Sequence, residues 1–121
     1  MTSYLPTALK ASSLALENRI SSIQILFRHD ERLCRFLFHH QERRLRATST
    51  EILEEARGLT REDRILVQVG LDFWSGSGAA RIPAVVGHLD DQRVMAFLRA
   101  VLRLREMDLY VTLTEEALYC D

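Results

Sequence analysis

The sequence is poor in the residues that mark several specialised classes of protein. Its 121 residues include two cysteines, five glycines and two prolines, and Lys10 is the single lysine among 16 basic residues. Two cysteines, Cys34 and Cys120, do not make the framework of a disulfide-stabilised domain, so we expect reduced thiols and a cytoplasmic protein. The low glycine and proline content excludes collagen-like and low-complexity chains.

Long hydrophobic runs and a large net charge are also missing. No apolar stretch approaches the roughly 20 residues that a membrane-spanning helix needs. Residues 1–10 hold no apolar run of signal-peptide length, so we expect no targeting segment and no membrane association. The formal net charge of −1 excludes a grossly basic nucleic-acid coat protein.

The remaining composition is that of one globular domain, with 47% hydrophobic and 27% charged residues. A chain of this length buries roughly two thirds of its unfolded surface, which is enough for a core of its own. We therefore predict a single helical domain over residues 1–121. Within it we expect a loose lead-in at 1–7, a Gly/Ser loop at 75–79 and a tail at 108–121.

In the N-terminal half, apolar spacing indicates helices. Leu16, Ile20, Ile23 and Phe27 share one helical face in a segment from about residue 8 to residue 28. Residues 31–57 are predicted to form either one long helix or two collinear helices broken near Thr48, where a capping box begins. Gly58 is expected to end this helical stretch in a left-handed turn.

In the C-terminal half, the pattern predicts helices at about 61–75, 83–88 and 91–105, with Thr60 and Asp90 as N-caps. Gly70 lies inside the first of these helices and predicts a close helix contact. The last helix carries the cleanest apolar stripe, and we expect Leu98 to be buried at its centre. The stripe consists of Val94, Phe97, Leu98, Val101 and Leu102.

Residues 109–113 alternate in polarity and are β-prone. The expected fold is all-α. We predict a single helical bundle of four to six helices with a short β-prone or frayed C-terminal tail.

Catalytic and metal chemistry have little support in the sequence. His39 and His40 are adjacent and point to different sides of a helix, and no spacing typical of a zinc site occurs. Cys34 is interpreted as a small core residue. A phosphotransfer histidine at His40 is weighed because Arg43 follows one turn later, but Arg44 occupies the next position, where a small residue is usual. We expect no metal, no cofactor and no enzymatic activity.

Two further patterns suggest anion or nucleic-acid binding. Ser77, Gly78 and Arg81 in and after the Gly/Ser loop form a possible anion site, but the Gly-Lys-Ser/Thr motif of nucleotide loops is missing, so a flexible connector is the favoured interpretation. Residues 28–46 carry six arginines against three acidic residues, and 51–72 carry six acidic residues against three arginines. Either the basic and acidic segments pair with each other, or the basic segment forms a phosphate-binding patch.

The order of the C-terminal helices resembles a helix-turn-helix with a rudimentary wing. In that arrangement the 91–105 helix would enter the major groove of DNA. The possible nucleic-acid contacts are Gln92, Arg93, Arg99 and Arg103. Asp90 and Asp91 place negative charge where phosphate would approach, which weakens this interpretation.

Phe73 and Trp74 occupy consecutive helical positions, so one helix presents aromatic surface in two directions. Such a helix buries a second face against its own bundle or against a partner. We therefore expect a small regulatory or adaptor protein that binds another protein, forms a homodimer and uses Phe73 and Trp74 as interaction residues. The alternative is a helix-turn-helix DNA-binding regulator using residues 83–105, and a phosphotransfer or anion-binding module is third.

Overall fold

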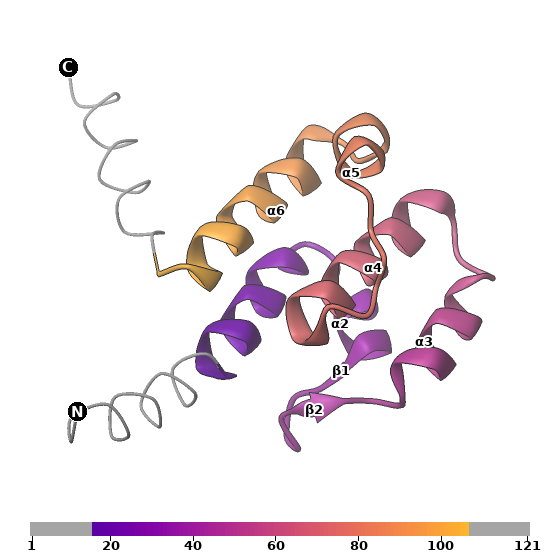
Figure 1. Ribbon diagram of the computed structural model, residues 1–121, viewed down its shortest axis with the longest axis vertical. Helices are drawn as coiled ribbons and strands as arrows, with labels where there is room; N and C mark the ends of the chain where they lie inside the picture. Colours follow the sequence, from indigo (N-terminus) through magenta and orange to yellow (C-terminus); the bar gives the residue numbers. More distant parts are fainter. Residues whose placement is uncertain (1–15, 107–121) are drawn as a thin grey trace, which may run out of the picture.

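The computed structural model describes residues 16–106 and shows a bundle of helices with one small hairpin (Figure 1). The predicted all-α class is confirmed. A first helix covers residues 16–26. The labelled elements follow it in the order α2 (Glu31–Leu37), β1 (Phe38–His39), β2 (Arg44–Leu45), α3 (Ser49–Ala56), α4 (Arg61–Ser75), α5 (Ile82–His88) and α6 (Asp91–Leu104).

Several sequence predictions fall outside the described residues: the lead-in at 1–7, the tail at 108–121 with its β-prone stretch, and Cys120. Among residues 16–106, no helix combines the length and the apolar character needed to cross a membrane.

Helix α4 is the centre of the bundle and packs against α2, α3 and α5. Its side chains Leu66, Val67 and Leu71 are fully buried. The predicted close contact at Gly70 is confirmed, because a Cβ atom there would lie 2.5 Å from Leu37 Cδ2. The missing side chain lets α2 and α4 approach each other.

Three helices start at the predicted caps, each with a side-chain oxygen that accepts a backbone N–H bond. Thr48 Oγ1 accepts from Glu51 N at 3.2 Å, and Thr60 Oγ1 accepts from Asp63 N at 3.3 Å. Asp90 Oδ1 accepts from Arg93 N at 2.8 Å at the start of α6. Each cap satisfies a backbone donor that would otherwise lack a partner within its helix.

For residues 31–57, the predicted break near Thr48 is confirmed because α3 begins there, but the prediction that the chain is helical up to that break was wrong. Helix α2 ends at Leu37, and an antiparallel hairpin pairs Phe38 with Leu45 before α3 begins. Arg43 takes a positive φ of 55° in the turn between the two strands. The Phe38 ring is buried and packs edge-on against Trp74, with ring centroids 5.2 Å apart. This tertiary contact, which no local spacing reveals, favours an extended chain where periodicity indicated a helix.

The left-handed helix end expected at Gly58 is also a correction. Gly58 does not take a positive φ, and α3 ends in tight bonds from Gly58 N to Glu55 O and from Leu59 N to Ala56 O. The left-handed residue is Gly76, with a φ of 72°, at the end of α4. A short helical turn already satisfies the last carbonyls of α3, so no left-handed residue is required there.

Candidate functional site

The most conspicuous surface feature is the apolar stripe of α6, which the bundle covers only in part: Val94 and Phe97 pack against the core, whereas Leu98 is exposed. Leu98 is 46% exposed and Met95 is 45% exposed. The expectation that Leu98 lies at the centre of a buried stripe was therefore wrong. The side chains that α6 buries are Ala96 and Ala100, and the helix packs on the bundle through these small residues together with Val94 and Phe97.

Helical rotation shows how much of the helix this stripe occupies. Successive residues turn by about 100° around the axis, so Ala96 and Ala100 lie about 160° from Leu98. Seven positions lie within about 60° of Leu98, and we call them the α6 outward face. They are Asp91, Val94, Met95, Leu98, Val101, Leu102 and Arg105. The five apolar members of this face are all half-buried or exposed.

Helix α6 lies at the edge of the bundle, beside the 16–26 helix, with α5 at its N-terminal end (Figure 1). The two other large apolar side chains that stand exposed in the described residues are Ile82 (69%) and Val86 (63%), both on α5. Two exposed side chains on one short helix form only a small patch, whereas a row of apolar residues along one side of α6 is typical of a binding surface.

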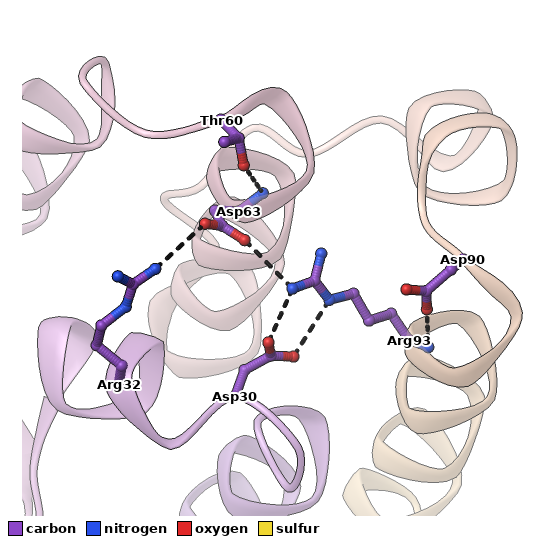
Figure 2. Close-up of polar contacts among 6 residues, drawn as sticks. All are labelled: Asp30, Arg32, Thr60, Asp63, Asp90 and Arg93. Atoms are coloured by element: carbon purple, nitrogen blue, oxygen red, sulfur yellow. Dashed lines mark hydrogen bonds and ion pairs between the residues drawn. The ribbon is translucent and has the colours of Figure 1, made fainter.

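A charged network fixes how α6 is rotated (Figure 2). The Arg93 guanidinium donates to both carboxylate oxygens of Asp30, through Nη2 at 2.8 Å and Nε at 3.2 Å. Arg93 Nη2 also donates to Asp63 Oδ1 at 3.3 Å, and Asp63 forms an ion pair with Arg32 at 3.8 Å. The network joins the N-terminal ends of α2, α4 and α6.

This network is partly shielded from water, because the Arg93, Asp30 and Asp63 side chains are 22%, 15% and 13% exposed. The hydrogen bond to Asp30 raises the pKa of Arg93 above its ordinary value, so the guanidinium stays charged. At the other end of α6, Asn18 Nδ2 donates to Glu106 Oε1 at 3.1 Å. Polar contacts at both ends of α6 keep its Ala96 side against the bundle and its Leu98 side toward solvent.

Of the four possible nucleic-acid contacts, Gln92, Arg99 and Arg103 lie within about 40° of one another on one side of α6, and Arg93 is set apart from them. Arg93 lies inside the network, where its donors already face carboxylates. Gln92 and Arg99 line a groove of about 230 Å³ between α6 and the end of the 16–26 segment, together with Arg28 and His29. Arg103 is half-buried. These positions lie beside the α6 outward face, not on it.

The possible anion site at Ser77, Gly78 and Arg81 already holds an anionic group from its own chain. The Asp72 carboxylate accepts from Gly78 N at 2.8 Å, from Ala79 N at 3.1 Å and from Ala80 N at 2.9 Å. Ser77 Oγ donates to Ser49 Oγ at 2.9 Å, and Arg81 is the exposed residue before α5. The backbone donors that suggested anion binding thus stabilise the loop itself.

Phe73 and Trp74 are half-buried and pack within the monomer. The Phe73 ring stacks on Phe97 of α6, with centroids 6.1 Å apart. The Trp74 ring contacts Phe38 and receives the Arg19 guanidinium over its face at 5.2 Å, and Arg19 Nη1 also donates to Trp74 O at 2.8 Å. Both side chains therefore have partners in their own chain.

Cys34 and His40 come together, with the sulfur 3.3 Å from His40 Nε2. Burial, reinforced by the charge of Glu31, raises the pKa of the Cys34 thiol from 9.0 to about 11. The group is therefore a protonated thiol at neutral pH and not an activated nucleophile. His39 and His40 are both exposed and lie on the hairpin, not on a helix. Among residues 16–106, no cluster of side chains is arranged to hold a metal ion.

The basic and acidic segments pair with each other, one of the two alternatives of the sequence analysis. Arg46 forms an ion pair with Glu55, and Arg32 forms one with Asp63. Three other arginines of residues 28–46 form ion pairs with acidic residues outside the 51–72 segment, which also reduces the positive field available to phosphate: Arg35 with Glu31, Arg43 with Glu17 and Arg44 with Glu42.

Sequence reasoning singled out the α6 stripe but assigned it to the core, and it passed over Met95. A signal for the correct orientation was present in Ala96 and Ala100, which are small residues one turn apart on the opposite side of the helix. Small residues allow the close backbone approach by which α6 packs on its neighbours. The chain matches no protein-family model, no curated protein and no solved structure.

Proposed function

We propose that the protein is a small regulatory or adaptor protein that acts by binding another protein chain through the α6 outward face. The observation that carries the proposal is the orientation of α6. Its small residues face the bundle, while Leu98 and Met95 are nearly half exposed. Covering one large apolar side chain that was exposed contributes about 1.5–3 kcal/mol, so a partner gains substantially by packing there.

DNA binding by α6 has less support. A recognition helix reads base edges and phosphates with polar side chains, whereas the centre of the α6 outward face is apolar. Arg93, the basic residue nearest the start of α6, is engaged by Asp30 and Asp63. DNA binding would therefore have to use the edge of the helix at Gln92 and Arg99.

The proposal is tested by replacing Leu98 with Gln and measuring the size of the protein in solution by light scattering. We expect the wild type to associate and the variant to remain monomeric with an unchanged monomer melting temperature. Val86→Gln on α5 is the matched control, because it removes a similarly exposed apolar side chain elsewhere. A wild type that stays monomeric, and that enriches specific duplexes from a random DNA library in a salt-dependent way, would favour the DNA alternative.

A further inference from the structure

The α6 outward face is self-complementary, which indicates what covers it. Leu98 lies midway between Asp91 and Arg105, which stand two helical turns before and after it. Both end residues are exposed and lie about 20° from the direction of Leu98. The face thus carries a negative charge at one end, a positive charge at the other and leucine at its midpoint.

From this pattern we infer that the partner of the α6 outward face is a second copy of the same helix, packed antiparallel about a two-fold axis at Leu98. The inference rests on the proposed function, because it identifies the partner of that surface. In a two-fold interface each contact occurs twice with the residues exchanged. Here Asp91 of each chain meets Arg105 of the other, and Leu98 meets its own copy.

The side chains between Asp91 and Arg105 are also consistent with this two-fold symmetry. Val94 falls opposite Leu102 of the second copy, and Met95 falls opposite Val101. Every apolar position on the face therefore meets an apolar position, and both charged positions meet opposite charges. A parallel arrangement would place Asp91 against Asp91 and Arg105 against Arg105, which is unfavourable.

The charged ends are available for such pairing. Within residues 16–106, neither Asp91 nor Arg105 takes part in an ion pair. The formal net charge of −1 also means that two copies repel each other only weakly. An interface built from one helix of each chain is small, so we expect a dimer with a dissociation constant on the order of micromolar.

Charge reversal tests the orientation. Asp91→Arg gives a face with two positive ends, and Arg105→Asp gives one with two negative ends. Each variant alone should self-associate about tenfold more weakly than the wild type, because like charges now meet at both ends. An equal mixture of the two should associate at least as well as the wild type. That recovery also shows that both variants are folded. Arg57→Asp, at the residue that follows α3, is the control and should leave self-association unchanged.

Cysteine cross-linking gives an independent readout in a Cys120→Ser background. Val94→Cys and Leu102→Cys should form a disulfide dimer only when the two variants are mixed. Cross-linking of each variant with itself would contradict the antiparallel arrangement.

Different outcomes would contradict the binding surface and the antiparallel dimer. If Leu98→Gln abolishes association but mixing the charge variants restores nothing, the antiparallel geometry is wrong and the binding surface stands. If the wild type is monomeric at every concentration, the second copy is excluded as the occupant. In that case either another segment of this chain or a different protein covers the face.

Discussion

Helices α4 and α6 carry similar apolar patterns but use them in opposite ways. In α4 the patterned residues Ile65, Leu66 and Val69 are buried among α2, α3 and α5. In α6 the patterned residue Leu98 points outward, and Ala96 and Ala100 contact the bundle. The comparison shows that an apolar stripe indicates a face that needs covering, but not whether the same chain provides the cover.

The sharpest test of this comparison is a matched pair of truncations. Leu66→Ala should reduce the free energy of unfolding by about 2–5 kcal/mol, because Leu66 is fully buried and its loss leaves a cavity. Leu98→Ala, measured in dilute solution where only monomer exists, should cost less than about 1 kcal/mol. Chemical denaturation of both variants checks the difference. Equal losses would place Leu98 in the monomer core and remove the basis of the proposed surface.

The next effect concerns Cys34 and alkaline pH. Because burial raises the pKa of its thiol to about 11, the folded protein holds this proton more tightly than the unfolded chain between pH 9 and pH 11. Stability should therefore be unaffected below about pH 9 and fall by about 2–3 kcal/mol as the pH rises to 11. Cys34→Ala should flatten this part of the curve of unfolding free energy against pH. Identical slopes in the two proteins would argue against a buried thiol.

The Arg93 network predicts a loss of intermediate size. Arg93→Leu leaves the Asp30 and Asp63 carboxylates partly buried without their shared cation, which should cost about 1–3 kcal/mol. Arg93→Lys keeps the charge but cannot form the two-pronged contact with Asp30, so its loss should be smaller. Thermal unfolding at fixed low protein concentration measures both. If Arg93→Leu melts with the wild type, the network does not hold α6 in place.

Much of this architecture can be predicted from short-range sequence signals. The caps at Thr48, Thr60 and Asp90 and the close contact at Gly70 are short-range signals, and each predicted its feature correctly. The hairpin at Phe38 was missed because a distant partner, Trp74, stabilises it.

The orientation of α6 was missed for a related reason. Periodicity shows which residues share one face of the helix. The Arg93 network and the contacts of Ala96 and Ala100 determine which face is turned toward the bundle. Arg93 itself was interpreted as a nucleic-acid contact because its carboxylate partners Asp30 and Asp63 lie 63 and 30 residues away.

The smallest expected effect contrasts two glycines. Gly70→Ala should be destabilising by about 1 kcal/mol, because overlap with Leu37 outweighs the gain in helix propensity. Gly87→Ala on α5 meets no atom within 4 Å and should stabilise the fold by up to about 1 kcal/mol. Differential scanning calorimetry of the pair measures the contrast. A stabilising Gly70→Ala would mean that α2 and α4 are not closely packed there.

Methyl NMR over a dilution series shows whether α6 turns its outward face toward a second copy. Spectra recorded across about a hundredfold range around the expected micromolar dissociation constant follow each methyl group separately. We expect concentration-dependent shifts for Met95, Leu98 and Leu102, with Ile52 and Leu66 unchanged. Spectra that do not change with concentration, or changes confined to Ile82 and Val86 on α5, would contradict this expectation.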